Sequence, residues 1–294
     1  MKNKHAGWQR VLILILPLLI TMGFFQMFGI LAAGITLNDF SEDIVLTDYQ
    51  HMITTFFGML GVFLVLWVFM KLFDKENFIQ MGFHLKGRFK ETVVGVLAGA
   101  VIMGLGYVIL LQMGEIQFSE VNFNGAELVF SILTFVFVAI MEEVLCRGYV
   151  LKNLMGSFNK YVALIVSSLL FSFMHGANPN LDAFALFNLF LAGIFLGISY
   201  IHTKNLWFPI ALHFSWNLFQ TLFGFNVSGQ DSYSLVEFSM TEKNILNGGD
   251  FGFEGSVFAM AVMIVSIAMI ELYYRKNNPQ LALESVSTEH TKNI

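Results

Sequence analysis

Eight stretches of the chain are apolar, and each is long enough, or nearly long enough, to cross a lipid bilayer. A membrane-spanning helix needs about 20 mostly apolar residues. The candidate stretches cover approximately residues 11–35, 52–73, 92–113, 128–150, 160–176, 183–202, 206–225 and 256–274. The fifth is the shortest. Because 56% of the 294 residues are hydrophobic and only 13% are charged, the composition excludes an ordinary soluble domain. The sequence predicts an all-α fold, a polytopic membrane bundle of about eight transmembrane helices.

The connections between these stretches alternate in charge. The first, third and fifth contain acidic residues and no Lys or Arg, and the seventh is acidic apart from Lys243. Basic residues gather in the second, fourth and sixth connections and after the last stretch: Lys71, Lys75, Lys86, Arg88, Lys90, Arg147, Lys152, Lys160, Lys204, Arg275 and Lys276. Since Lys and Arg favour cytoplasmic loops, the alternation predicts that both termini are cytoplasmic. Seven or nine spans would break this pattern.

Domain organisation follows from the same pattern. We expect one integral membrane domain over residues 1–275 and a polar cytoplasmic tail over residues 276–294. The first apolar run is much longer than the core of a cleavable signal peptide, which predicts an uncleaved first helix. A single Cys excludes an internal disulfide framework. No face or tail concentrates basic residues as a nucleic-acid-binding protein would.

Charged residues interrupt the fourth apolar stretch in the segment "MEEVLCRGYV", residues 141 to 150. A charge near the bilayer centre costs at least a few kcal/mol. Glu143 and Arg147 are four residues apart, so they share a helix face and are expected to form an ion pair. Glu142 lies about 100° around the helix from Glu143 and cannot easily share Arg147. The pattern predicts that Glu142 is left as a candidate general base for water.

Two further polar groups fall within other apolar stretches. His175 ends the fifth stretch, four residues after Phe171. His213 and Asn217, in "ALHFSWNLF", are four apart in the seventh and face the same way. Neutral donors on one face are suited to stabilising a developing negative charge where water is excluded. Each residue by itself also has a plain structural interpretation, such as an ion pair, an interhelical hydrogen bond or an interfacial histidine. Their concentration on three of the eight stretches favours one shared site.

Small residues at a spacing of four mark two other stretches. Gly95 and Gly99 lie in the third, and Gly193 and Gly197 in the sixth. Such pairs allow a helix to approach a neighbour closely. The spacing predicts tight packing of these two helices.

These motifs, in this order, resemble those of a known family. The chain contains E-E-x-x-x-R as Glu142, Glu143 and Arg147, then F-x-x-x-H as Phe171 and His175, then H-x-x-x-N as His213 and Asn217. The ordered set resembles the CPBP family (CAAX protease and bacteriocin-processing, also called Abi), which is related to type II CAAX prenyl endopeptidases. The resemblance covers about residues 128–225.

The resemblance implies an intramembrane endopeptidase whose active site opens to the cytoplasm. Carried over by motif position, Glu142 and His175 would activate water, and His213 with Asn217 would stabilise the tetrahedral oxyanion. Glu143, Arg147 and Phe171 would be structural support. The substrate would be a membrane-associated peptide or protein, CAAX-like or with a leader, prenylated or not. The host membrane would be the cell membrane, or the endoplasmic reticulum membrane in a eukaryote.

Three alternatives stay open at this point. No cofactor is favoured, but Glu142, His175 and His213 could instead be three ligands of a catalytic zinc. Buried Glu, His and Arg also occur in proton-coupled transporters. A non-catalytic membrane scaffold or immunity protein would need none of this chemistry. The oligomeric state is left open.

One tension concerns depth in the membrane. At 1.5 Å per residue, Glu142 and His213 lie on the order of 10 Å from the predicted cytoplasmic ends of their helices, whereas His175 lies about 20 Å from Lys160. Either the fifth helix protrudes into the cytoplasm or the cavity is a deep funnel.

Overall fold

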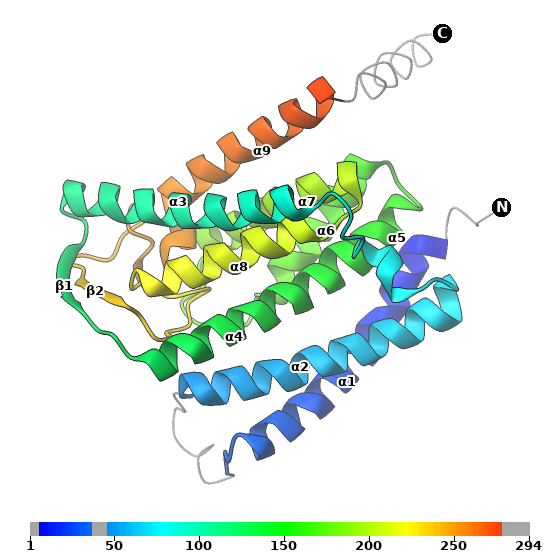
Figure 1. Ribbon diagram of the computed structural model, residues 1–294, viewed down its shortest axis with the longest axis horizontal. Helices are drawn as coiled ribbons and strands as arrows, with labels where there is room; N and C mark the ends of the chain where they lie inside the picture. The colour runs from blue at the N-terminus through cyan, green and yellow to red at the C-terminus, as the bar shows by residue number, and fades with distance from the viewer. Residues whose placement is uncertain (1–5, 37–45, 278–294) are drawn as a thin grey trace.

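The computed structural model describes residues 6–36 and 46–277. Most of the predicted polar tail and the acidic residues Asp39, Glu42 and Asp43 lie outside these ranges. Within them the fold is a helical bundle, shown in Figure 1. Its helices are α1 (Ala6–Ala32), α2 (Asp48–Phe69), α3 (Phe89–Met113), α4 (Gly125–Glu143), α5 (Lys152–Met155), α6 (Lys160–Met174), α7 (Ala183–Thr203), α8 (Trp207–Leu222) and α9 (Val257–Asn277). In the described ranges, six helical segments are long and apolar enough to span a membrane, so the protein is a polytopic helical membrane protein.

The bundle has two chemically different ends. α2, α5, α7 and α9 finish at one end, and the connections there contain most of the Lys and Arg residues. We call this the basic end; it lies to the right in Figure 1. α3, α6 and α8 finish at the other, the acidic end, where the connections contain mainly Asp and Glu.

Two of the central helices are short. α6 has 15 residues and α8 has 16, which gives about 22 and 24 Å at 1.5 Å per residue. Both values are below the roughly 30 Å of a bilayer hydrocarbon core. α8 packs against α3, α4 and α7 and buries most of its residues. α8 is tolerated because protein, rather than lipid, surrounds most of it, whereas α6 packs on α7 with one face and leaves the other exposed.

The fourth helix is longer than the sequence predicts. After Glu143 the chain continues as a π-helix, Val144–Leu151, and then as α5, so one helical rod of 31 residues runs from Gly125 to Met155. Glu142 therefore lies about 20 Å from the basic end of this rod. His175, directly after α6, lies about 22 Å from the start of that helix. The side chains of Glu142 and His175 are at similar depth, so the difference between these two came from placing the helix end at residue 150 instead of 155, whereas His213 still lies about 9 Å from the start of α8.

The glycine pairs pack as predicted. A Cβ built on Gly99 would lie 2.1 Å from Ser215 Oγ, and one on Gly95 would lie 2.9 Å from Ala211 Cβ, both in α8. On α7, a Cβ on Gly193 would lie 2.8 Å from Ser168 Cα in α6. Only glycine permits these approaches. α8 is thereby held against α3, and α6 against α7.

A small sheet at the acidic end departs from the all-α prediction. β1 (Gln117–Val121) and β2 (Val236–Ser239) pair antiparallel, with Gln117 opposite Ser239 and Val121 opposite Val236. Strands this short give a weak sequence signal, and their pairing joins connections that are more than 100 residues apart. The sheet links the third connection to the seventh.

Candidate active site

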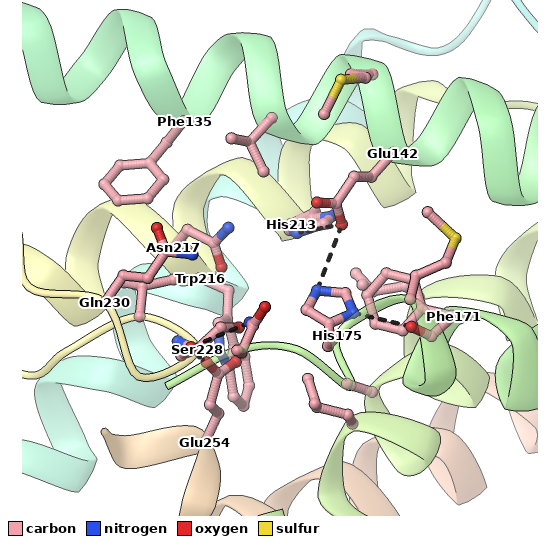
Figure 2. Close-up of a pocket in the computed structure, with 18 of the residues that line it drawn as sticks. Phe135, Glu142, Phe171, His175, His213, Trp216, Asn217, Ser228, Gln230 and Glu254 are labelled. Atoms are coloured by element: carbon pink, nitrogen blue, oxygen red, sulfur yellow. Dashed lines mark hydrogen bonds and ion pairs between the residues drawn. The ribbon is translucent and has the colours of Figure 1, made fainter. Parts of the chain in front are cut away.

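A cavity of about 250 Å³ contains the predicted site residues. Glu142 from α4, His175 after α6, and His213 and Asn217 from α8 all line it, together with Phe171 (Figure 2). These side chains are separated by up to 75 positions in the sequence. The close packing of α8 on α3 and of α6 on α7 therefore brings together the groups that the motifs single out.

Glu142 occupies the centre of the constellation. Its Oε2 atom lies 3.9 Å from His175 Nε2 and 3.9 Å from His213 Nε2. These distances are too long for direct hydrogen bonds. Among the described residues, this buried oxygen has no hydrogen-bond partner. One carboxylate oxygen and two ring nitrogens thus face a common point.

The orientation of His175 is set by the end of α6. His175 is the residue that follows the last helical turn, and its Nδ1 donates to the Phe171 carbonyl oxygen at 2.8 Å. A carbonyl can only accept, so Nδ1 carries a proton. In the neutral ring, Nε2 is then an unprotonated acceptor that faces Glu142. The F-x-x-x-H motif places this carbonyl one turn before the histidine.

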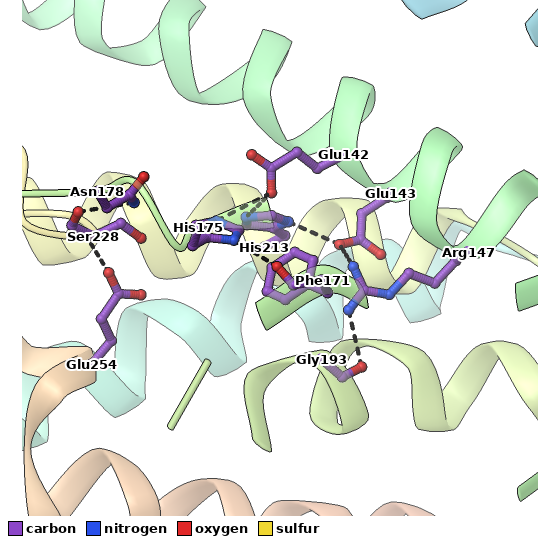
Figure 3. Close-up of polar contacts among 10 residues, drawn as sticks. All are labelled: Glu142, Glu143, Arg147, Phe171, His175, Asn178, Gly193, His213, Ser228 and Glu254. Atoms are coloured by element: carbon purple, nitrogen blue, oxygen red, sulfur yellow. Dashed lines mark hydrogen bonds and ion pairs between the residues drawn. The ribbon is translucent and has the colours of Figure 1, made fainter. Parts of the chain in front are cut away.

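Glu143 contacts both Arg147 and His213, as Figure 3 shows. Its Oε1 accepts from Arg147 Nη1 at 2.8 Å and from His213 Nδ1 at 2.8 Å. Glu143 and Arg147 are 0% and 1% exposed. The expected ion pair is present, but the contact with His213 was not predicted, because it joins two helices. Glu143 therefore orients a ring in the cavity as well as neutralising Arg147.

Arg147 also joins three helices. Its Nη2 donates to the Gly193 carbonyl of α7 at 3.0 Å, and its guanidinium lies 4.7 Å from the Phe171 ring of α6. Arg147 belongs to the π-helix that follows Glu143, and such distortions are frequent at functional sites. Phe171 thus contributes a ring to Arg147 and a carbonyl to His175, which explains its place in the motif.

Asn217 lies one turn after His213 on the same face of α8. Its side chain is 6% exposed and lines the cavity. Its amide makes no hydrogen bond to any residue in the described ranges. A buried amide costs free energy unless a partner satisfies it. Asn217 is therefore placed to bind a group that enters the cavity.

Sequence reasoning missed the lining residues from the seventh connection. Ser228, Gln230 and Glu254 lie outside the apolar stretches, yet they line the same cavity. The Ser228 N–H donates to the carboxylate of Glu254, which is 7% exposed. The only sequence signal was an acidic residue in a long connection, and its distance along the chain from Glu142 hid the relation.

The exposed residues of the cavity lining lie near the acidic end. Of its lining residues, Met174 and Gln230 are exposed, and both lie there. No lining residue comes from the basic connections at residues 70–90, 152–160 or 203–207. The exposed part of the lining is therefore at the end with few Lys and Arg residues.

The three potential zinc ligands do not fit a tetrahedral zinc where they stand. Around such a zinc, bonds of about 2.0–2.1 Å separate neighbouring ligand atoms by about 3.3 Å. Here the Glu142 oxygen lies 3.9 Å from each histidine nitrogen. Within the described ranges, no cluster of three or more His, Cys, Asp or Glu side chains has a metal-binding arrangement. We derive no step through a metal.

Comparison with known proteins gives one family match in this part of the chain. Residues 124–219 match the family model described as Type II CAAX prenyl endopeptidase Rce1-like. The match covers α4, α6, α7 and most of α8, and every motif residue lies inside it. No curated protein matches the chain. Over residues 124–219, the matched residues and the ordered motifs support a relation to the CPBP, or CAAX protease, family of membrane proteases.

Proposed function

We propose that this protein is an intramembrane endopeptidase that hydrolyses a peptide bond with a water activated by Glu142 and His175. The observation that carries the proposal is the convergence of Glu142 Oε2 and two histidine Nε2 atoms at 3.9 Å. Polar groups separated by such a distance are commonly bridged by one water molecule. A water there would be held by two acceptors.

The first step follows from this geometry. Glu142 takes one proton from the water while the water oxygen attacks the scissile carbonyl carbon, and His175 Nε2 accepts a hydrogen bond from the O–H that remains and so orients the attack. When the tetrahedral intermediate breaks its C–N bond, the proton passes from Glu142 to the leaving amine. General acid–base catalysis of this kind contributes about 10²–10⁴-fold. No covalent bond to the protein forms.

His213 and Asn217 are proposed to stabilise the oxyanion. The Asn217 amide has no hydrogen-bond partner in the described residues, so its N–H groups are free to donate. In its imidazolium form, His213 donates with both nitrogens, through Nδ1 to Glu143 and through Nε2 to the oxyanion. Donors fixed in a water-poor cavity stabilise such a charge strongly because they need no reorganisation. Glu143, Arg147 and Phe171 position the two histidines.

The peptidase assay uses purified protein in liposomes and a synthetic library of hydrophobic peptides. Some peptides carry a CAAX-like end, prenylated or unprenylated, and others carry a leader-like segment. Mass spectrometry identifies new termini. We expect cleavage by the wild type that is lost in Glu142→Gln. Equal products from both proteins would refute the proposal.

We further propose eight membrane crossings, with both termini in the cytoplasm. In this arrangement residues 1–275 form one integral domain, residues 128–225 its catalytic core, and residues 276–294 a cytoplasmic tail. The charge alternation supports this topology through the preference of Lys and Arg for the cytoplasm. The cavity then opens away from the cytoplasm, because its exposed lining residues Met174 and Gln230 lie at the acidic end. The family resemblance implies the opposite, a cytoplasmic opening.

The topology is testable because Cys146 is the only cysteine and is buried. New cysteines at Lys86 and Thr241, both exposed, are labelled in intact cells with a membrane-impermeant maleimide. We expect labelling at position 241 and none at 86 until the cells are opened. The reverse pattern would return the cavity mouth to the cytoplasm.

A further inference from the structure

Glu254 is a buried carboxylate in the cavity that the proposed reaction does not use. It precedes α9 and lies across the cavity from Glu142 in Figures 2 and 3. It is 7% exposed. Removal of a carboxylate from water is costly unless a counter-charge compensates. A positively charged group near Glu254 would therefore stabilise it.

The chain supplies little positive charge to Glu254. Its carboxylate accepts the Ser228 N–H, and no Lys or Arg lines the cavity among the described residues. The nearby titratable groups are His175 and His213, which the hydrolysis mechanism already uses. Burial raises the pKa of the Glu254 carboxyl, although the Ser228 hydrogen bonds and the two histidines oppose this. A bound cation would offset that burial.

The mouth of the cavity also carries negative charge, like the site around Glu254. Asp231 lies between the lining residues Gln230 and Ser232. Asp48 Oδ1 accepts a hydrogen bond at 3.1 Å from the N–H of Tyr233, the residue after Ser232. Burial raises the pKa of Asp231, and the charges of Glu237 and Asp48 add to this. A positively charged peptide is therefore attracted towards the mouth, and Glu254 lies further in.

We propose that Glu254 is a specificity-determining residue that binds a Lys or Arg side chain of the substrate, near the scissile bond. The inference rests on the proposed peptidase function. It follows from a buried carboxylate in the catalytic cavity that has no Lys or Arg partner within residues 6–36 and 46–277. The substrate class is a membrane-associated peptide with a basic residue beside the cleavage site.

The test compares matched peptides taken from the sequence that the library assay identifies. One position at a time carries Lys, Arg, norleucine or Glu, and all peptides are acetylated at the N-terminus to exclude its ammonium group. We expect one position at which Lys or Arg raises kcat/KM by about tenfold or more over norleucine. A tenfold ratio corresponds to about 1.4 kcal/mol, which is less than a hydrogen bond to a charged group contributes. Glu254→Gln keeps an oxygen for the Ser228 N–H and removes the charge, and we expect it to reduce this ratio to near one.

Glu242→Gln is the matched control. Glu242 is exposed in the same connection and does not line the cavity, so the Lys to norleucine ratio is expected to stay at the wild-type value. If Glu254→Gln lowers kcat/KM for both peptides equally, Glu254 is structural and the inference is overturned. If no position prefers a basic residue, the inference fails while the peptidase proposal stands. No cleavage that depends on Glu142 would overturn both.

Discussion

Two cations at the basic end have ion-pair partners, whereas the Glu142 carboxylate in the cavity has an oxygen with no hydrogen-bond partner among the described residues. At the basic end, Arg10 contacts Asp74 at 2.5 Å and Lys152 contacts Glu76 at 2.5 Å. In the cavity, Glu142 Oε2 is buried without a hydrogen-bond partner among the described residues. Unpaired buried groups destabilise a fold. The contrast indicates that Arg10 and Lys152 are neutralised within the chain, where their role is structural, whereas Glu142 is left without a hydrogen-bond partner where a substrate is expected to bind.

The largest expected effect is on Glu142 itself. Glu142→Gln keeps the shape of the side chain and removes the base, so we expect peptide cleavage to fall by about 10²–10⁴-fold. The thermal midpoint in detergent should stay equal or rise, because an unpaired buried charge is removed. Cleavage within threefold of wild type would remove Glu142 from the mechanism.

Arg147 and Lys152 compare a buried ion pair with a partly exposed one. Arg147→Met leaves Glu143 buried without its cation, and we expect a loss of about 3–5 kcal/mol in the free energy of unfolding. Lys152→Met breaks a pair whose side chains are 26% and 21% exposed, and we expect a loss of about 0–1 kcal/mol. Unfolding in mixed micelles measures both. Similar losses would show that burial does not distinguish the two pairs.

Asn217 and Asn153 are two buried asparagines, 6% and 7% exposed. Asn153 donates to the Tyr149 carbonyl at 3.1 Å, whereas Asn217 has no partner in the described residues. We expect Asn217→Ala to lower kcat by about 10²–10³-fold, as the loss of one oxyanion donor does, with a small effect on stability. Asn153→Ala should lower stability and leave kcat within a few-fold. Exchanged outcomes would contradict the oxyanion assignment.

Two glycines test the packing that positions α8. A methyl group on Gly99 would overlap Ser215 Oγ at 2.1 Å, and nothing lies within 4 Å of one on Gly23. We expect Gly99→Ala to destabilise the protein by about 1–3 kcal/mol and Gly23→Ala to be neutral or slightly stabilising. The same unfolding assay applies. A harmless Gly99→Ala would mean that α8 can move away from α3 at no cost.

The smallest expected effect is that of metal removal. Because the Glu142 and histidine atoms are too far apart for tetrahedral zinc ligation, we expect cleavage to be unchanged within twofold in a strong chelator. Metal analysis of the same preparation accompanies the assay. Activity that is lost on chelation and restored by zinc would establish the zinc-dependent mechanism in its place.

Much of the fold and of the site was predictable from local pattern. Apolar runs delimit the helices to within a few residues for most of them, since the bilayer imposes a minimum length. The i, i+4 spacings predicted that Glu143 pairs with Arg147 and that His213 and Asn217 share a face. The π-helix after Glu143 was not predictable, because it is stabilised by contacts with other helices. Because this continuation depends on contacts with other helices, the predicted fourth helix ends at residue 150, five residues before the observed end at Met155.

The sequence by itself determined the membrane class, most helix boundaries to within a few residues and which residue types carry the chemistry, because these depend on composition and on spacing within one helix. Only the tertiary structure decided that Glu143 holds His213, that Glu254 faces the catalytic cavity and that the cavity mouth lies at the acidic end. These relations join residues 26 to more than 100 positions apart. Their physical origin is the packing of α6 on α7 and of α8 on α3 and α4, together with the position of the segment before α9, which no local pattern encodes.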